Sequence, residues 1–321
     1  MAQFPLLSLP SVALEHVVKL FDPFELFDLS QCSPKGIALV RLAGTKQYKL
    51  SLESKRVVVN EKYKFEAEVY GKHEKRCLSL TNGKLFLTNG IFIHVEYYRG
   101  YWDKCSFYFG DRNLGLQVIQ FHLTELFGCR IDSIDTGLDF PGEIQKSIIR
   151  QVIEKQKEIR RLVIDINLNE NVLRWIMDNL RITEYCECYV MTSPDFGYEF
   201  RTYPRFLLIR FSHWFKLDNL LAAAKSCVVI RLLDSKLENK DIDVFMKAWA
   251  TGDFPTLRYL VVESDNLNDR DQILGRGPDQ WRNNEGDDLR EEIKINGKIY
   301  EIHNGVKFQS EHGVESKIEM D

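Results

Sequence analysis

The sequence has no uninterrupted apolar run near the roughly 18 residues that a membrane-spanning helix needs, so we expect no membrane segment. A secretory signal is also missing, because the first residues carry no basic stretch and Pro5 and Pro10 interrupt their apolar character. The chain has 7 cysteines, an odd number at uneven spacing, which indicates reduced and mostly buried thiols. Together these features predict an intracellular protein of the cytoplasm or nucleus.

An excess of positive charge is absent as well. The chain has 43 Lys and Arg against 47 Asp and Glu, a formal charge of -4, and its basic residues are scattered. A nucleic-acid-binding protein needs a clustered basic surface, so no nucleic-acid partner is expected.

Motifs of catalysis and cofactor binding are missing too. The 7 histidines are dispersed, and no HExxH motif, Gly-x-Ser-x-Gly elbow or glycine-rich phosphate loop occurs. Two close pairs of carboxylates, Asp132 with Asp135 and Asp287 with Asp288, are better explained as loop and helix-cap residues. We therefore predict a protein that is not an enzyme and that binds no cofactor.

A few motifs leave two interpretations open, and in each case a structural role is the simpler one. Cys186 and Cys188 have the spacing of two metal ligands on one face of a strand, but no second pair accompanies them, so buried thiols are favoured over a metal site. The charge run from Glu154 to Arg161 is interpreted as the solvated face of a helix. Aromatic residues near helix starts and faces are expected in the core rather than as ligand-stacking groups: Trp175, Trp214, Phe215 and Trp249.

What the chain does have is a strongly apolar N-terminal segment. Ser11 is expected to cap a first helix, in which Leu14, Val17, Val18 and Phe21 share one face. A second helix is predicted after Asp22, with Pro23 at its first position and Glu25 completing a capping box. Phe24, Leu26, Phe27 and Leu29 make this second helix apolar on most sides, so the pair must pack against the rest of the chain or against another protein.

The chain as a whole is typical of a globular protein, with 44% hydrophobic residues. Ser33 and Pro34 begin a third helix, which Gly36 weakens and Gly44 ends. A period of two then predicts antiparallel strands, with Asn82-Gly83 as the strongest hairpin signal. These strands are expected at Tyr48–Leu52, Val57–Val59, Tyr63–Val69, Cys77–Leu80, Leu85–Leu87, Ile91–Val95 and Cys105–Phe109.

A helix over 114–127 follows, with Val118, Phe121, Leu123 and Leu126 as its predicted core, and then a strand at 131–134. From residue 143 onward helices and strands alternate at intervals that resemble leucine-rich repeats, without the strict ladder position of those repeats. A hairpin is expected around Asn296-Gly297, a short strand at 306–308, and a frayed acidic tail after it.

The order of residues in the N-terminal helices resembles the F-box. Its marks are Leu9-Pro10, an apolar helix, the turn Asp22-Pro23-Phe24-Glu25-Leu26 and the segment Leu29-Ser30-Gln31-Cys32-Ser33, in a variant similar to the F-box proteins of nematodes. Further on, the segments beginning at Ser212-His-Trp-Phe, Leu237-Glu-Asn and Phe254-Pro-Thr-Leu resemble the type 2 F-box-associated domain of those proteins.

This resemblance implies an α+β fold in three parts. Residues 1–45 are the short helical F-box, residues 46–135 form an antiparallel β-rich middle, and residues 136–321 form the F-box-associated domain with an alternating α/β, solenoid-like layer. It also implies a function: the substrate-recognition subunit of a Skp–cullin–F-box ubiquitin ligase, which binds a Skp-family adaptor, the cullin through it, and a protein target of unknown identity. Expected adaptor contacts are Leu9, Pro10, Leu14, Val17, Val18, Pro23, Phe24, Leu26 and Phe27, with Leu9, Pro10, Phe24 and Phe27 as anchors.

Two departures from the family pattern bear on this expectation. Ser33-Pro34-Lys35-Gly36 stands where many F-boxes begin a helix that carries a tryptophan, and the last residues, 304–321, lack the β-rich ending of the family. The alternative hypothesis is a non-catalytic scaffold whose F-box-like helices pack on the protein's own sheet and recruit no ligase.

Overall fold

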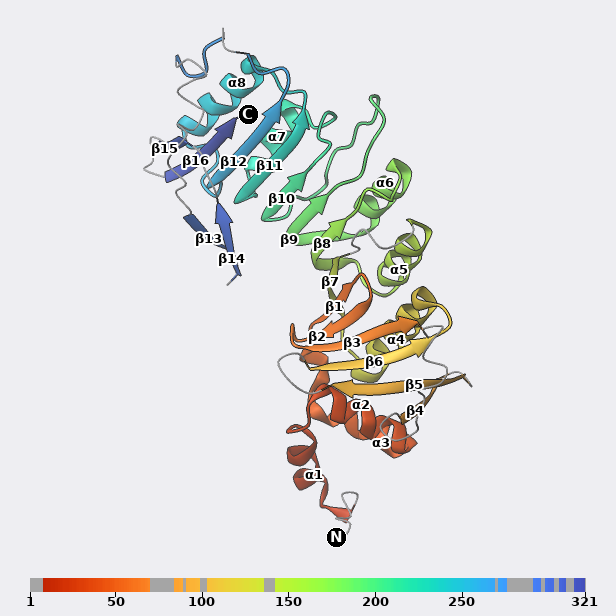
Figure 1. The fold of residues 1–321 in the computed structure, drawn as a ribbon. Coiled ribbons are helices and arrows are strands. Elements are labelled where there is room, and N and C mark those ends of the chain that lie inside the picture. Colours follow the sequence, from red (N-terminus) through yellow and green to blue (C-terminus); the bar gives the residue numbers. More distant parts are fainter. Residues whose placement is uncertain are drawn as a thin grey trace. The chain divides into compact units, whose positions relative to one another are not determined.

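The computed structural model describes residues 8–69, 84–88, 91–98, 103–135, 142–268, 271–275, 291–295, 298–302, 306–309 and 315–320. The chain forms two compact units, Met1–Phe140 and Pro141–Asp321 (Figure 1). No helix within the described ranges has the length and apolar character to cross a membrane. The predicted mixture of helices and strands is confirmed, while the finer division into residues 1–45, 46–135 and 136–321 stays a prediction.

The first unit contains three short helices, a seven-stranded sheet and one longer helix. Its helices are α1 (Ser11–Val18), α2 (Pro23–Cys32), α3 (Pro34–Val40) and α4 (Arg112–Phe127), with short 3₁₀ turns at Arg41–Ala43 and Thr45–Gln47. Its strands are β1 (Leu50–Glu53), β2 (Arg56–Val59), β3 (Tyr63–Val69), β4 (Lys84–Thr88), β5 (Ile91–Tyr98), β6 (Lys104–Phe109) and β7 (Ile131–Asp135).

Helix α2 begins directly after its predicted cap, whereas α1 begins one residue earlier than predicted. The Asp22 carboxylate accepts hydrogen bonds from the backbone N–H groups of Phe24 and Glu25 at 2.8 and 2.9 Å, and Glu25 accepts from the Asp22 N–H at 2.8 Å. The predicted capping box is therefore confirmed. In α1, by contrast, Ser11 is the first helical residue and Pro10 is the cap, with no side-chain hydrogen bond, because the helix starts one residue earlier than expected.

The sheet of the first unit is mixed rather than antiparallel throughout. Its strand order is β7-β1-β2-β3-β6-β5-β4, in which β1 with β7 and β3 with β6 are parallel and the other neighbours are antiparallel. Strands β3 and β6 are parallel neighbours because β4 and β5, which lie between them in sequence, extend the sheet beyond β6. Strands β1 and β7 are parallel neighbours because α4 carries the chain from β6 back to β7, beside β1. The predicted strand Cys77–Leu80 and the Asn82-Gly83 turn lie outside the described residues.

One face of this sheet is apolar and is covered by α2 and α4. Phe65 and Phe107 on the strands are buried, as are Leu123 and Leu126 of α4, which confirms two predicted core positions. Phe121, predicted in the core, is instead 52% exposed. It lies on the turn of α4 that faces away from the sheet, because the buried stripe of this helix runs through Leu116, Ile119, Leu123 and Leu126.

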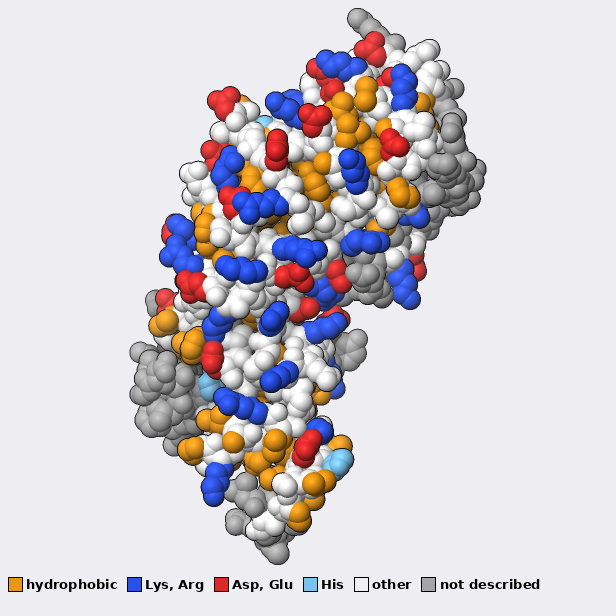
Figure 2. Space-filling view, turned by 180° about the vertical axis from the view of Figure 1, so that it is seen from behind, with side chains coloured by type: hydrophobic (Ala, Val, Ile, Leu, Met, Phe, Trp, Pro, Cys, Tyr) orange, Lys and Arg blue, Asp and Glu red, His pale blue; other side chains and the backbone are white. Residues whose placement is uncertain are grey.

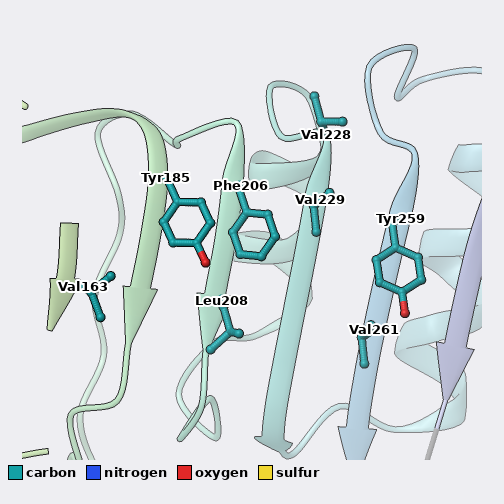
Figure 3. Packing of buried hydrophobic residues seen from close by; sticks show 8 residues of the cluster. All are labelled: Val163, Tyr185, Phe206, Leu208, Val228, Val229, Tyr259 and Val261. Atoms are coloured by element: carbon teal, nitrogen blue, oxygen red, sulfur yellow. The ribbon is translucent and has the colours of Figure 1, made fainter. Parts of the chain in front are cut away.

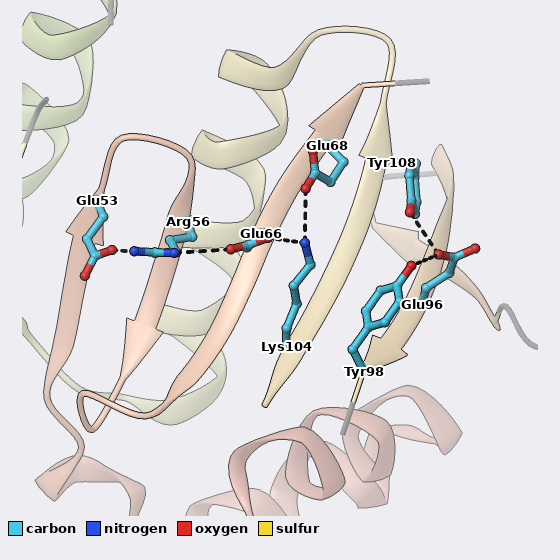
Figure 4. Close-up of polar contacts among 8 residues, drawn as sticks. All are labelled: Glu53, Arg56, Glu66, Glu68, Glu96, Tyr98, Lys104 and Tyr108. Atoms are coloured by element: carbon cyan, nitrogen blue, oxygen red, sulfur yellow. Dashed lines mark hydrogen bonds and ion pairs between the residues drawn. The ribbon is translucent and has the colours of Figure 1, made fainter. Parts of the chain in front are cut away.

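The opposite face of the same sheet carries a row of charged and phenolic side chains (Figure 4). Glu66, whose side chain is 6% exposed, accepts from Arg56 at 3.4 Å and forms a short ion pair with Lys104. Arg56 also pairs with Glu53, and Lys104 with Glu68 at 3.3 Å. Further along, a second group forms because the hydroxyls of Tyr98 and Tyr108 both donate to Glu96.

The second unit alternates strands and helices over most of its length. Its helices are α5 (Gly142–Lys155), α6 (Glu170–Asn179), α7 (Leu217–Ala224) and α8 (Asn239–Ala250). Its strands are β8 (Glu158–Ile164), β9 (Arg181–Cys188), β10 (Phe206–Ile209), β11 (Val229–Ser235), β12 (Tyr259–Ser264), β13 (Glu291–Ile295), β14 (Lys298–Ile302), β15 (Val306–Gln309) and β16 (Glu315–Met320).

Strands β8 to β12 are parallel and lie side by side in chain order, and β16 and β15 follow them at one edge. Cys186 and Cys188 of β9 are buried on the face that meets α6, beside Leu173 and Trp214. Burial raises the pKa of the Cys188 thiol to about 11, so both groups behave as apolar core residues.

The charge run from Glu154 to Arg161 is only partly a helical face, since Glu154 and Lys155 alone lie on α5. Helix α5 ends at Lys155 and β8 begins at Glu158, so Glu158, Arg160 and Arg161 lie on a strand. Their ion pairs run between strands: Arg160 with Glu184 at 3.2 Å, and Glu158 with Arg181 at 3.3 Å. The helix prediction was wrong here because the buried Ile159, Leu162 and Ile164 extend the strand in the amino-terminal direction.

The C-terminal hairpin is confirmed, and the predicted frayed tail is wrong. β13 and β14 pair antiparallel as a separate two-stranded sheet. Residues Glu315–Met320 form β16, which pairs parallel to β12 and antiparallel to β15. Their charged residues alternate with Ile318 and Met320, so the segment has the period of a strand despite its acidic composition.

The strands β8–β12 also bury a cluster on the face away from the helices (Figure 3). The side chains of Tyr185, Phe206, Val229 and Tyr259 lie in one row across adjacent strands, with the rings of Tyr185 and Phe206 stacked at 4.4 Å. The sheet of the second unit therefore has apolar side chains on both faces, which is typical of parallel sheets.

Candidate protein-interaction surface

The N-terminal helices are attached to the sheet of the first unit mainly through α2. The Phe24 ring lies edge-on to Phe65 at 4.9 Å and to Tyr63 at 5.4 Å, and the Phe27 ring meets Phe107 at 5.4 Å. Both phenylalanines are at most 2% exposed. Aromatic pairs of this geometry add about 0.5–1.5 kcal/mol beyond the burial of their area, so α2 belongs to the core of this unit.

Polar contacts hold the same helix in place. The Tyr97 hydroxyl of β5 donates to the Asp28 carboxylate of α2 at 2.6 Å, and burial together with this contact raises the pKa of Tyr97. On the α4 side, His122 lies 3.5 Å from the Gln31 amide and edge-on to the Phe27 ring. Burial lowers the pKa of His122, which favours the neutral imidazole in this position.

Most residues predicted to contact an adaptor are therefore inside the protein. Phe24 and Phe27, expected as anchors, pack against the unit's own sheet, and the assignment of adaptor-contacting residues stays a prediction. The reason is that the most regular apolar stripe of a short helix packs on the nearest core. The buried members of the predicted set are Leu14, Val18, Pro23, Phe24, Leu26 and Phe27.

Other residues of the predicted set remain accessible. Pro10 is exposed, while Leu9 and Val17 are half-buried. Two further apolar side chains, absent from the predicted set, are exposed: Val12 of α1 is 67% exposed, and Leu20 in the turn after α1 is 84% exposed. The sequence pattern indicates a shared face for these side chains, since Val12, His16 and Leu20 follow one another at intervals of four residues.

We call the accessible apolar residues of α1 and its two ends, of α3 and of the following 3₁₀ turn the helical apolar surface; it consists of Pro10, Val12, Val17, Leu20, Ile37 and Leu42. Figure 2 shows hydrophobic side chains gathered at the lower end of the molecule, where α1 lies in Figure 1. Exposed apolar groups on neighbouring short helices are typical of a protein-binding surface.

The unusual start of α3 has a packing reason. A Cβ atom on Gly36 would lie 2.1 Å from the carbonyl oxygen of Leu29, so the absence of a side chain lets α3 approach the backbone of α2. Ser33 caps the helix by accepting from the Gly36 N–H at 3.1 Å, as predicted. Gly36 therefore sets the angle at which Ile37 is presented.

Within the described ranges, no three His, Cys, Asp or Glu side chains are grouped as they would be around a metal ion. The features of the first unit thus point to protein contact through the helical apolar surface.

Comparison with known families adds a second observation, in the other unit. Residues 201–262 match the family described as F-box associated. This segment contains β10, α7, β11, α8 and most of β12. Neither a curated protein nor a solved structure matches the chain.

Conspicuous residues of the F-box-associated segment are core residues. Trp214 is buried and meets Phe196 edge-on at 5.1 Å, and Phe215 beside it is also buried. Phe245 of α8 stacks on Phe254 at 5.0 Å, next to Trp249. The prediction that Trp214, Phe215 and Trp249 are core residues is confirmed, so these residues of the matched segment specify its packing and are not exposed to a target.

Proposed function

We propose that this protein is the substrate-recognition subunit of a Skp–cullin–F-box ubiquitin ligase. The first unit would bind a Skp-family adaptor through its N-terminal helices, and the second unit would bind the protein to be ubiquitinated. The protein would perform no covalent chemistry itself, because holding a target near a separate enzyme raises the effective concentration of that target.

The observation that carries this proposal is the F-box-associated match of residues 201–262. Proteins with that segment typically pair it with an N-terminal F-box, and the helices α1 to α3 occupy the corresponding place in this chain. The Leu9-Pro10 and Asp22-Pro23 elements begin α1 and α2, respectively, which supports the same interpretation.

The helical apolar surface is the part of these helices that we propose for the adaptor. Phe24 and Phe27 of the predicted set are buried in the chain, whereas this surface includes Pro10 and Val17 of that set, with half-buried Leu9 next to Pro10. The solenoid-like arrangement of β8–β12 is likewise part of the proposal, as is a cytoplasmic or nuclear location where such ligases act.

The test is co-purification of the full chain with a Skp-family adaptor. We expect the native chain to retain the adaptor and the double variant Val12→Glu/Leu20→Glu to lose it by at least about tenfold, because two charges would enter an apolar interface. The matched control is Val244→Glu on α8, which is 48% exposed but lies in the other unit.

Two results would contradict the proposal. One is failure of the native chain to bind any adaptor offered. The other is equal adaptor binding by the native chain, the Val12→Glu/Leu20→Glu variant and a Leu9→Ala/Pro10→Ala variant.

A second candidate function has an observation of its own. The burial of Phe24, Leu26 and Phe27 against the first unit's own sheet is what a scaffold protein without a ligase would show. Under this alternative, hydrogen exchange in α1 would be as slow in the free protein as with adaptor present. Under the ligase proposal, adaptor slows exchange in α1 and α3.

A further inference from the structure

Two arginines of neighbouring strands in the second unit, Arg231 within β11 and Arg210 directly after β10, lie on the face that carries the buried cluster of Figure 3. Arg231 on β11 is level with Leu208 on β10. Arg210 comes two residues after Leu208, and its N–H donates to the Cys188 carbonyl at 2.9 Å. The pairing between strands therefore continues through Arg210, and both arginine side chains leave the sheet on the same face.

Tyr189 completes the group from β9. Its N–H donates to the Ile164 carbonyl at 2.9 Å, so this residue also continues the strand, and its hydroxyl donates to Glu187 at 3.4 Å. Burial raises the pKa of the Tyr189 hydroxyl, whereas the charges of Arg210 and Arg231 act in the opposite direction. Because Cys188 is level with Ile209, Tyr189 is level with Arg210 on the neighbouring strand.

These two arginines differ from the others on this face. Arg161 lies over the Tyr185 ring at 3.9 Å, and the Glu187 carboxylate accepts from the hydroxyls of Tyr185 and Tyr189. In the described part of the chain, Arg210 and Arg231 have neither an ion pair nor a side-chain hydrogen bond, and the Nε of Arg231 is buried without a partner. A buried donor without an acceptor is destabilising, and an incoming acceptor would remove that cost.

The surroundings limit the kind of ligand. Arg210 is exposed, whereas Tyr189 and Leu233 are half-buried and pack on the cluster of Figure 3. Glu263 lies on β12, with β11 between it and Arg210. An extended polyanion needs a broad basic surface, and a pair of arginines in a chain with a formal charge of -4 does not provide one. One anionic side chain flanked by apolar residues fits the group better.

We propose that Arg210, Arg231 and Tyr189 form a recognition site for an acidic segment of the target protein, with the anionic group on the two guanidiniums and an apolar neighbour on Leu233. The proposal rests on the proposed function, because it assigns the target to this face. The shared chemistry is an anionic oxygen acceptor, supplied either by a carboxylate or by a phosphorylated hydroxyl group.

The test uses the full chain and immobilised random-sequence peptides that share one central residue: glutamate, phosphoserine or glutamine. We expect the native chain to bind at least one anionic pool about tenfold more tightly than the glutamine pool, and Arg210→Gln or Arg231→Gln to remove that preference. Preference for the phosphoserine pool or for the glutamate pool identifies the source of the anion.

The matched control is Arg205→Gln, which makes the same change in charge at an exposed position before the other end of β10. Because Arg231 is half-buried, Arg231→Lys is included: it keeps the positive charge and is expected to retain part of the preference. Equal binding of all three pools by the native chain would overturn the proposal, and so would an equal loss in the Arg205→Gln control.

The adaptor assay separates this proposal from the proposed function. Variants of Arg210 and Arg231 are expected to bind the Skp-family adaptor like the native chain, because the helical apolar surface lies in the other unit. Adaptor binding without an anion preference overturns only the recognition site. An anion preference without adaptor binding overturns the proposed ligase.

Discussion

At the scale of single residues, Gly36 shows how a position that weakens a helix is required by packing. In an isolated helix, alanine is more favourable than glycine by roughly 1 kcal/mol. In this protein the added methyl group would lie 2.1 Å from the Leu29 carbonyl oxygen, a distance that real Cβ contacts do not reach. The steric contact between α2 and α3 therefore reverses the sign of the substitution.

We expect Gly36→Ala to lower the free energy of unfolding by about 1–3 kcal/mol, the usual cost of forcing extra atoms into a packed site. Chemical denaturation followed by circular dichroism measures this value. Gly110→Ala is the control, because no atom lies within 4 Å of the added carbon there. A stabilised Gly36→Ala variant would contradict the close approach of the two helices.

Glu66 is the second residue with a measurable consequence. Burial raises the pKa of its carboxyl, but the hydrogen bonds and charges of Lys104 and Arg56 outweigh burial, and the net shift is downward. A pKa that is lower in the folded state means that Glu66 stabilises the protein above its unfolded-state pKa of about 4.3. That contribution is lost as the pH falls through the folded-state pKa.

We expect Glu66→Gln to lower the free energy of unfolding at pH 7 by about 1–3 kcal/mol, since it removes the shared partner of two cations. The difference in the free energy of unfolding between the native protein and the variant should narrow as the pH falls below about 4, because the native Glu66 side chain is then protonated as well. Glu68→Gln is the control, because Glu68 is 27% exposed and contacts Lys104 alone. A difference in stability that stays constant down to pH 2 would show that the charge of Glu66 does not cause it.

At the scale of elements, α2 is the helix whose role changed most between sequence and structure. Its apolar residues predict a partner, and the structure supplies that partner as the sheet of the same unit. The stripe along α1 behaves in the same way, with Leu14 and Val18 buried and Val12 and Leu20 outside. A helical segment that is apolar on most sides therefore has both an internal and an external contact.

We expect Phe24→Ala or Phe27→Ala to lower the free energy of unfolding by about 3–5 kcal/mol, the usual cost of removing a buried phenylalanine. The measurement is denaturant unfolding of the free protein. Leu20→Ala is the control and should change stability by less than about 0.5 kcal/mol, because Leu20 is 84% exposed. If Phe24→Ala leaves the stability of the free protein unchanged, α2 is not part of the core.

The elements of the second unit follow the sequence more closely. From α5 to β12, helices and strands alternate over most of the segment, as the sequence predicts from residue 143 onward. Each is a short apolar segment between clear turn residues, so its type depends on local period alone. The error at Glu158–Arg161 arose where charged residues on a strand have the composition of a helix.

At the scale of the whole molecule, two compact units carry the two kinds of surface on which the proposals rest. The helical apolar surface belongs to the first unit, and the Arg210, Arg231 and Tyr189 group belongs to the second. Under the proposed function the chain binds two proteins, and the proposal assigns each of them to a different unit.

The sequence by itself determined the mixed helix and strand content, the capping box at Asp22, the alternation of strands and helices in the second half and the core positions of Trp214 and Trp249. These features depend on the period of apolar residues and on cap chemistry, which act over a few neighbouring residues. The pattern at Ser212–Phe215 also pointed to the F-box-associated segment for the same local reason.

Only the tertiary structure decided which apolar side chains face inward and which cations remain unpaired. Phe24 and Val12 are both apolar residues of helical segments, and the difference between them is set by the strands that α2 meets. Arg161 and Arg210 are both strand arginines. The Arg161 guanidinium lies over the Tyr185 ring, whereas the Arg210 side chain has no partner in the described ranges. Burial and pairing depend on residues far apart in the chain, so no local pattern contains them.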